Sequence, residues 1–399
     1  MAHAWKHLAE LRQVLNDPPV PPIGFPAATD IDFQAVADLH DGIINNLGDP
    51  EQDGREPRNS KAIERDLVHD LIKLFGGEVE ECWGYVTQAG STEGNQYGLL
   101  LARERFPDGV LYSSAAAHYS VPKAAHLLRM SANAVVVPAD LRGEMDYDQL
   151  ATAAAARSGQ AAIVVATAGT TMTEAVDDVR RIHAALDDAG VPDRHIHVDG
   201  ALAGVPLALD GGPTARLLSH ADSDIVRLDA DSICISGHKF FATPHISGVV
   251  LSRRRHVQRV SHAVDYIDGC DATVSGSRSG HSAVELWYAL TSLGWDGHRR
   301  RVAKSRALAA YLEQRLASAG WTAWRHPHAF TVMLRSAPQP LLKRWSLATS
   351  GGWSHIICVP GLTLQTINLF LNELGTRPSR TGRAPTLTAQ RVGLRAATA

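Results

Sequence analysis

The sequence predicts an α/β fold in which helices cover both faces of a mainly parallel sheet, with a smaller α+β unit after it. From Ser60 to about residue 290, apolar runs rich in Val, Ile and Ala alternate with helical patterns. Buried β-branched runs separated by helices are typical of parallel sheets. After residue 290 this alternation stops. The 399 residues are 45% hydrophobic and 20% charged, as in an ordinary globular protein.

Residues 1–59 are expected to form an arm rich in proline and polar turns. The opening stretch MAHAWKHLAELRQVLNDPP has the pattern of a short amphipathic helix that ends at the prolines. It lacks the unbroken apolar core of a secretory signal. The first helix beyond the arm is expected over 60–77, with Ser60 as its cap and two glycines at its end.

The region that follows alternates between strands and helices. Ser120 is expected to cap the second of these helices. Strands are expected over 84–88, 109–114, 133–140, 161–167, 194–199 and 232–236, and after Pro244, and helices over 91–106, 120–130, 146–157 and 177–190.

These patterns predict a large domain over 60–290 and a small C-terminal domain over 291–376. The small domain would hold one long helix over 298–320, strands over 329–335 and 354–360, and a segment over 362–375 that completes the unit. Residues 377–399 are rich in Arg, Thr and Ala and show no apolar period, so a disordered tail is expected there.

Charge and cysteine usage exclude several classes of protein. The net charge is −3, so no strong field attracts nucleic acid or an anionic membrane. No apolar run approaches the roughly 20 residues that span a bilayer. The four cysteines are scattered and form no CxxC pair, which argues against a zinc knuckle or a disulfide framework. Cytoplasmic residence is therefore expected.

Reactive side chains follow several of the expected strands, at the sheet edge where α/β proteins bind ligands. The turn Gly90 to Asn95 opens a helix and offers amides and hydroxyls to a phosphate. His118, Asp199 and Lys239 also follow strands. A lysine for a Schiff base, a carboxylate for a ring nitrogen and an anion site together match pyridoxal 5′-phosphate.

The same residues lie in motifs that resemble the group II amino acid decarboxylases, which are pyridoxal-phosphate enzymes of fold type I. Among these, the chain is most similar to the bacterial histidine decarboxylase and plant serine decarboxylase branch. The resemblance covers about residues 40–375 and implies a seven-stranded type of central sheet. The matching motifs are NNLGDP (45–50), the segment 83–125, AGTTMTEAVDD (168–178), HIHVDGALAG (195–204), CISGHKF (234–240), TVSGSRSGH (273–281) and WSHIICVPGLT (353–363).

The resemblance implies a role for each matching position. Lys239 would bind the cofactor covalently, Asp199 would pair with its ring nitrogen, and His118 would stack on the ring near the substrate carboxylate. The phosphate would contact Ser91, Thr92, Ser236 and His238. Ala201 would pack beneath the ring, and Thr170 and Thr171 would support its edge.

Members of fold type I have active sites between subunits, so a homodimer or a higher oligomer is implied. The segment TVSGSRSGH would then reach the neighbouring subunit's cofactor, with Thr273, Ser275 or Ser277 near its phosphate. His118, Lys239 and Tyr266 are candidate proton donors, although Tyr266 is more readily placed in the subunit interface. His245 is a further candidate for contact with the substrate.

The implied reaction is decarboxylation of an L-amino acid to its amine and CO2. Histidine is the leading substrate, while serine, an aromatic amino acid and a specialised amino acid stay open. The segments TPHISG (243–248) and ATAGTT (166–171) depart from the family pattern near the pocket. Transamination and decarboxylation coupled to oxidation are also open.

Two distant alternatives fit the sequence less well. His195 and His197 form an HxH pair, as in metal-dependent hydrolases, but His220, His262 and His281 supply no second pair at diagnostic spacing. No metal site is therefore expected. A regulatory protein on a retired fold is disfavoured, because Lys239, Asp199 and His118 are all present.

Overall fold

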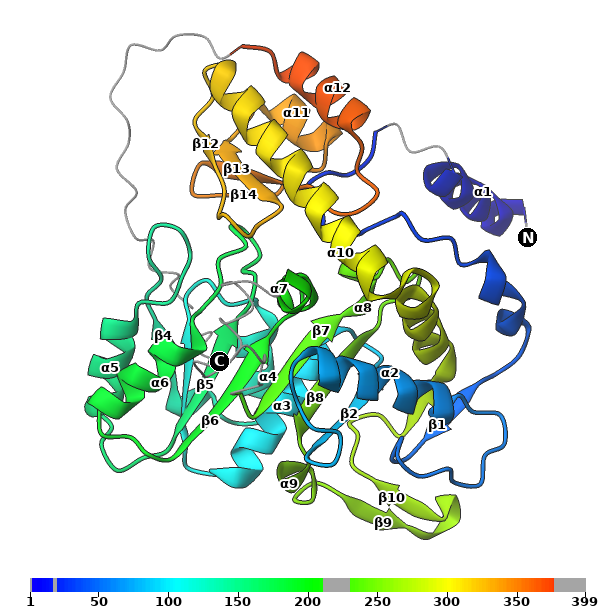
Figure 1. Ribbon diagram of the computed structural model, residues 1–399, viewed down its shortest axis with the longest axis vertical. Coiled ribbons are helices and arrows are strands. Elements are labelled where there is room, and N and C mark those ends of the chain that lie inside the picture. The colour runs from blue at the N-terminus through cyan, green and yellow to red at the C-terminus, as the bar shows by residue number, and fades with distance from the viewer. Residues whose placement is uncertain (1, 17–19, 211–229, 377–399) are drawn as a thin grey trace.

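A computed structural model describes residues 2–16, 20–210 and 230–376 (Figure 1). The expected disordered tail at 377–399 lies outside these residues, as does His220. Within the described residues, no helix is both long enough and apolar enough to cross a membrane.

A seven-stranded sheet forms the centre of the fold, with strand order β2-β8-β7-β6-β5-β3-β4. Strands β7, β6, β5, β3 and β4 run parallel to one another, whereas β8 pairs antiparallel with both β7 and β2. The expected mainly parallel sheet is confirmed. The strands are β2 (Cys82–Thr87), β3 (Val110–Ser114), β4 (Ala134–Val137), β5 (Ala162–Thr167), β6 (Arg194–Asp199), β7 (Ser232–Ser236) and β8 (Gly248–Arg253).

Helices pack on both faces of this sheet, as Figure 1 shows. Strands β2, β5 and β7 are buried along their whole length, and β3, β6 and β8 at all but one residue, because apolar side chains on each face meet a helix. The helices of this region are α2 (Lys61–Leu74), α3 (Ser91–Arg105), α4 (Ser120–Leu127), α5 (Tyr147–Ala155), α6 (Val179–Asp188), α7 (Gly204–Asp210), α8 (Gly237–Phe240) and α9 (Arg254–Val257), with the short 3-10 helix η2 (Ser131–Asn133).

Two expected helix caps differ from the structure. Ser60 does occupy the N-cap position of α2, but its hydroxyl donates to the carbonyl of Gly280 and makes no capping bond. Ser120 is the first residue of α4, after Tyr119 at the N-cap. Its hydroxyl lies 2.8 Å from both Asn95 Nδ2 and His118 Nδ1. Both serines are therefore used in tertiary contacts, which outweigh the local preference for capping.

A second, four-stranded antiparallel sheet of order β12-β13-β15-β14 has its own apolar cluster. The long helix α10 connects the two sheets (Figure 1). It consists of two helical segments joined at a kink at Gly294, whose φ of 60° is not helical, and the segment after Gly294 contains most of the helix expected over 298–320. The elements are β12 (Ala323–Trp324), β13 (Thr331–Arg335), β14 (Thr349–Ser350), β15 (Trp353–Ile357), α10 (Gly280–Ser318), α11 (Gln339–Arg344) and α12 (Leu364–Leu374).

The N-terminal segment is more ordered than a simple arm. The amide of Ile357 donates to the carbonyl of Ile23, which ties the segment to the second sheet. Two small ribbons complete the fold. The remaining elements are α1 (Ala2–Asn16), the 3-10 helices η1 (Gln34–Asp41) and η4 (Asp265–Ile267), β1 (Asn45–Leu47) paired with β11 (Ser277–Ser279), and β9 (His262–Val264) paired with β10 (Gly269–Asp271).

Candidate active site

Lys239 lies in α8, directly after the carboxyl end of β7, and its side chain is half-buried. Burial lowers the pKa of its amine, and the nearby Asp199 carboxylate opposes this effect. Within residues 2–16, 20–210 and 230–376, the Lys239 amine makes no hydrogen bond or ion pair. A desolvated amine with a lowered pKa is a better nucleophile, because more of it is neutral.

Asp199 ends β6, the neighbour of β7, and is 3% exposed. Its Oδ2 accepts a hydrogen bond of 2.8 Å from Asn95 Nδ2, and its Oδ1 accepts one of 3.2 Å from the amide of Ala201. These donors hold a buried carboxylate in the orientation that faces the site. The adjacent parallel strands bring Asp199 and Lys239 to one edge of the sheet.

His118 completes this group from the loop between β3 and α4. Burial lowers the pKa of its imidazole, the Asp199 carboxylate raises it, and the Lys239 ammonium lowers it. Both Asp199 and Lys239 therefore lie close enough to His118 to act electrostatically on its imidazole. Its Nδ1 lies 2.8 Å from Ser120 Oγ. The pKa below its ordinary 6.5 makes a neutral ring the main form at pH 7.

The turn before α3 forms a cradle for an anion. Ser91 Oγ accepts a hydrogen bond of 3.0 Å from Ser236 Oγ, and the amide of Ser91 lies 3.3 Å from that same hydroxyl. Thr92 and Glu93 occupy the next two positions, where helical amides lack an intrahelical acceptor. The structure thus places free amides and two hydroxyls at a helix N-terminus, as an anion site requires.

Gly90 fixes the shape of this cradle. Its φ is +60°, and a Cβ there would lie 3.0 Å from His238 Cε1. His238 is in turn 3.3 Å, through Nδ1, from the carbonyl of Ser247. Glu93 accepts hydrogen bonds from the amides of Gln88 and Ala89 and so holds the turn from the other side. The backbone can approach a ligand here because no side chain intervenes.

The residues expected at the ring edge lie beyond β5 and β6. Thr170 is buried and its hydroxyl lies 2.9 Å from Thr173 Oγ1, whereas Thr171 is exposed. Ala201 is partly buried and follows Asp199 by two residues. Thr170, Thr171 and Ala201 thus follow the strands β5 and β6, the second of which ends at Asp199. Their contacts with a cofactor ring stay predictions.

The other predicted site residues do not join this group within one chain. His245 is exposed and its Nδ1 lies 2.6 Å from Glu285 Oε1. Tyr266 is 82% exposed and lines a separate hollow with Ile267. Thr273 Oγ1 lies 2.8 Å from Asp271 Oδ1, and Ser275 Oγ lies 3.5 Å from Glu93 Oε1. Their predicted role across a subunit interface requires a second chain and stays a prediction.

Sequence reasoning missed Asn95 as a site residue. Its Nδ2 donates to Asp199 and Ser120, and its Oδ1 lies 2.9 Å from His197 Nε2. Because Nδ2 can only donate, Oδ1 faces donors, and His197 presents its Nε2–H. The available signal was its position four residues after Ser91, on the helix face that looks toward the sheet.

The HxH pair has no catalytic geometry. His195 and His197 are both fully buried within the sheet. His197 belongs to the Asn95 network. His195 is the second residue of β6, at the far end from Asp199, near Asp231 and His256, where Arg105 already pairs with Asp231 at 3.0 Å. The two histidines therefore do not form one metal centre.

The residues present fit pyridoxal phosphate. A lysine amine without a partner among the described residues, a buried carboxylate held by two donors, an imidazole and a glycine-lined anion cradle converge at one sheet edge. When bound, the cofactor would be held by Lys239, Asp199 and the Ser91 turn. The fold and the site together define a pyridoxal-phosphate enzyme of fold type I.

Comparison with known proteins identifies the family. The pyridoxal-dependent decarboxylase conserved domain matches residues 86–321. A histidine decarboxylase of Mesorhizobium japonicum is 41% identical over 89% of this chain and 93% of its own. Serine decarboxylase 1 of Oryza sativa is 36% identical over 88% of this chain and 71% of its own. The chain therefore belongs to the pyridoxal-dependent decarboxylase family.

Solved structures support the same assignment. A mutant form of L-methionine decarboxylase from Streptomyces sp. 590 superposes with a TM-score of 0.82 at 25% identity, and the match covers 93% of this chain and 94% of its own. The protein is thus a pyridoxal-phosphate-dependent amino acid decarboxylase.

Proposed function

We propose that the protein converts L-histidine to histamine and CO2. The observation that carries this proposal is the similarity to bacterial histidine decarboxylases over nearly the whole of both chains. A second such enzyme, from Pseudomonas entomophila, is 40% identical over 89% of this chain and 84% of its own. L-Serine is the second candidate, and the likeness to the rice serine decarboxylase favours it.

The residues of the chain divide the work at the site. The bound cofactor supplies an electron sink for the pair released when the bond from Cα to the carboxylate breaks. Lys239 supplies an amine with a lowered pKa. Asp199, held by Asn95, would present its negative charge toward the ring nitrogen of the bound cofactor. His118 would stack on the ring, and its neutral imidazole would move a proton at Cα.

A panel of amino acids tests the substrate. The cofactor-loaded protein is incubated with each amino acid, and CO2, amine, ammonia and peroxide are measured together. We expect the highest kcat/KM for histidine, with CO2 and histamine in equal amounts and no peroxide. A higher kcat/KM for serine would replace histidine with the second candidate. Peroxide and ammonia with the CO2 would indicate a coupled oxidation, and a keto acid without CO2 a transamination.

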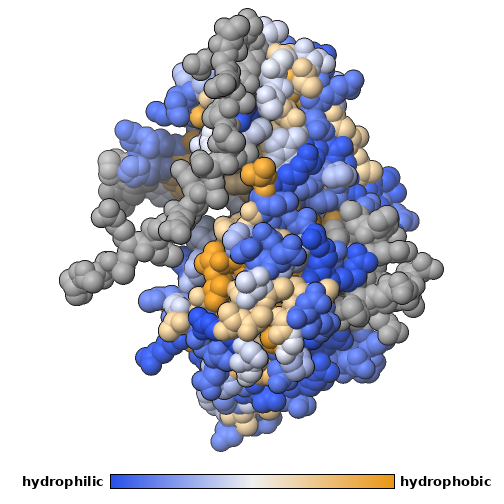
Figure 2. Space-filling view, turned by 90° about the vertical axis from the view of Figure 1, so that its left-hand side faces the viewer, coloured by the Kyte–Doolittle hydropathy of each residue, from blue (hydrophilic) through white to orange (hydrophobic). Residues whose placement is uncertain are grey.

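We also infer a homodimer, in which Thr273 and Ser275 approach the other subunit's cofactor. Helix α1 supports this inference, because it lies apart from the body of the chain in Figure 1 and exposes large apolar side chains. On the face shown in Figure 2, by contrast, hydrophobic residues form small groups among hydrophilic ones. The exposed apolar residues of α1 are Trp5, Leu11, Val14 and Leu15.

Light scattering on the full chain tests the inferred dimer. A mass of two chains is expected, and a mass of one chain at micromolar concentration would contradict the inference. The boundaries of the large and small domains, cytoplasmic residence and the absence of a nucleic-acid partner stay predictions.

A further inference from the structure

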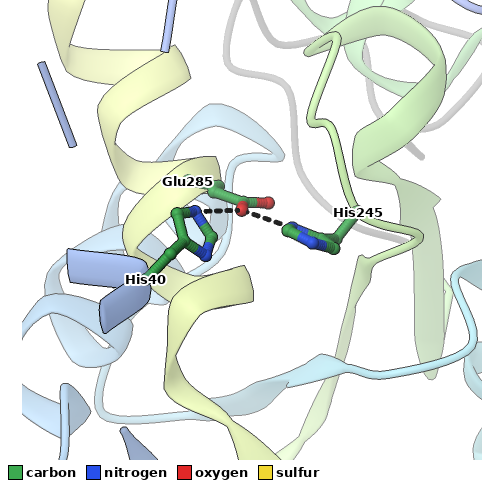
Figure 3. A group of neighbouring side chains, drawn as sticks. All are labelled: His40, His245 and Glu285. Carbon is green, nitrogen blue, oxygen red and sulfur yellow. Dashed lines mark hydrogen bonds and ion pairs between the residues drawn. The ribbon is translucent and has the colours of Figure 1, made fainter. Parts of the chain in front are cut away.

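His40, His245 and Glu285 meet at one point although they come from three separate elements (Figure 3). His40 is in η1, His245 is in the loop between α8 and β8, and Glu285 is in α10. Their meeting point borders a hollow of about 280 Å³, which His40, His245 and His281 line with Gln88 and Ser282. The cluster does not include His118, Asp199 or Lys239.

The carboxylate of Glu285 is the buried centre of this cluster. Its side chain is 1% exposed, and Oε1 lies 2.6 Å from His245 Nδ1 and 3.4 Å from His40 Nε2. Figure 3 shows the two rings on either side of that oxygen. Oε2 is buried and has no hydrogen-bond partner among the described residues. A buried carboxylate with an unpaired oxygen is costly unless a cation or donor completes it.

The donor set matches a transition-metal ion. Each residue offers one ligand atom, and all three atoms lie within 4.8 Å of one another. Donors at about 2.0–2.1 Å from a shared tetrahedral ion lie roughly 3.3 Å apart, so a small shift of the exposed rings suffices. Two imidazoles and one carboxylate are preferred by Zn²⁺, Co²⁺ or Ni²⁺, whereas Mg²⁺ and Ca²⁺ prefer oxygen ligands throughout.

We propose that His40, His245 and Glu285 bind one divalent cation of the Zn²⁺ class, with a fourth position open to the hollow. Three protein ligands and one open position are typical of accessible zinc sites. Because both histidines are exposed, the ion can enter from solvent.

Neighbouring contacts hold His40 in place for this role. Its ring stacks on that of His281, with centroids 5.0 Å apart and planes 11° apart. His281 Nε2 lies 3.1 Å from the carbonyl of Leu39, so it anchors the end of η1 and is not free to be a ligand through that nitrogen. The stacked ring of His281 therefore limits the motion of the His40 ring beside Glu285.

The bound ion would restrain the loop that follows the active-site lysine. Thr243 Oγ1 lies 3.0 Å from Ser247 Oγ, and the carbonyl of Ser247 accepts from the amide of Gly237 at 2.8 Å. The loop that carries His245 thus contacts the start of α8, and the metal would tie that loop to η1 and α10.

Calorimetric titration with ZnCl2 tests the proposal on the tag-free, cofactor-loaded full chain after chelator treatment. We expect one saturable site in the wild type, and His40→Ala and His245→Ala each to weaken Zn²⁺ binding by at least about tenfold. His126→Ala is the matched control, because it removes an exposed histidine from α4 and should leave the affinity unchanged. Every variant keeps the same cofactor, so any Zn²⁺ bound by the cofactor contributes equally to each titration and does not affect the difference between variants.

Glu285→Gln gives a second variant, with circular dichroism to confirm that this buried substitution leaves the fold intact. It should also weaken binding, because the anionic ligand becomes a neutral amide. Anomalous scattering at the zinc edge from a soaked crystal should place the ion between the three side chains. No saturable binding, or equal affinity for the wild type and a His40→Ala/His245→Ala double variant, would overturn the proposal.

Discussion

Asn95 donates a hydrogen bond of 2.8 Å to Oδ2 of Asp199, and both side chains are buried. The same amide nitrogen lies 2.8 Å from Ser120 Oγ, which contacts His118 Nδ1 at 2.8 Å. One amide therefore sets the orientation of the carboxylate and reaches the imidazole through a single hydroxyl. Because its oxygen faces His197, the amide cannot rotate without losing bonds on both sides.

Replacement of Asn95 by Asp should nearly abolish turnover. The change keeps the size of the side chain but puts a second acidic group where Asp199 now finds a donor. We expect kcat to fall by at least about 100-fold, in the range found for loss of one well-placed electrostatic contact. Steady-state kinetics and circular dichroism measure activity and fold together. Gln96→Glu adds the same charge one residue along α3 and should keep most activity, whereas an active Asn95→Asp enzyme would exclude the positioning role.

Lys239→Ala should abolish CO2 release and the covalent attachment of the cofactor. The amine it removes has no hydrogen-bond or ion-pair partner among the described residues, so the fold should be kept. Borohydride treatment followed by denaturation measures attachment, since reduction fixes the cofactor to a lysine. Lys123→Ala is the control, because Lys123 also acts electrostatically on His118 but lies over the ring of Tyr119. Persistent attachment in Lys239→Ala would assign the link to another lysine.

Asp199→Asn should lose most turnover while the protein still binds the cofactor. The variant removes the negative charge. It also places an amide at position 199 beside the amide of Asn95, which now donates to the Asp199 carboxylate. A loss of about 10²–10³ in kcat is expected from the electrostatic role. Absorbance of the bound cofactor and release of CO2 measure the two properties separately. Near-normal activity of the Asp199→Asn variant would contradict the proposed pairing of Asp199 with the ring nitrogen.

Lys239, Asp199 and His118 could be predicted from the sequence because each follows a recognisable apolar strand. Each residue type and its position after a strand can be recognised within a short stretch of sequence. Parallel strands then bring the three residues to one edge of the sheet, because the carboxyl ends of these strands meet there. Asn95 could not be predicted in the same way, because an Asn near the start of a helix is as readily a turn or capping residue as one that makes a buried tertiary contact. Its partners are 25, 102 and 104 residues away, and only the fold selects them.

Other features depend on contacts that no local pattern encodes. Arg278 lies in the motif expected at the subunit interface, yet it is buried against Glu64. The His40, His245 and Glu285 cluster joins positions up to 245 residues apart, from 40 to 285. Tyr266, Thr273 and Ser275 need a second chain for their predicted role, so neither one sequence nor one chain tests them.

Arg278→Ala should destabilise the protein by about 3–5 kcal/mol, as loss of one partner of a buried ion pair does. Arg278 pairs with Glu64 and donates 3.0 Å to the carbonyl of Gly48. Glu64 also accepts from Asn46 Nδ2 and from the amide of Val86. Urea unfolding measures the difference. Arg55→Ala is the matched control: its pair with Asp268 is exposed, so a loss below about 1 kcal/mol is expected. Equal losses for the two would contradict the buried role.

Glu174→Gln should stabilise the protein increasingly as the pH rises from about 4.5 to 7. Burial raises the pKa of Glu174 to about 7, although hydrogen bonds from Thr331 lower it. The unfolded chain therefore loses this proton first, and the free energy of unfolding falls over that window and levels off above it. Gln cannot ionise, so the variant avoids a loss on the order of a few kcal/mol.

Urea unfolding of both proteins at pH 5 and pH 8 measures this difference. Glu80→Gln serves as the control, because Glu80 is exposed. Its free energy of unfolding should change between pH 5 and pH 8 by the same amount as that of the wild type. A Glu174→Gln advantage that is the same at pH 5 and pH 8 would mean that the pKa of this carboxyl group is not raised by burial. The contact at stake joins the turn after β5 to β13, since Glu174 Oε2 accepts from both the amide and the hydroxyl of Thr331. The pH dependence would therefore measure the contribution of this contact between the two sheets to the free energy of unfolding.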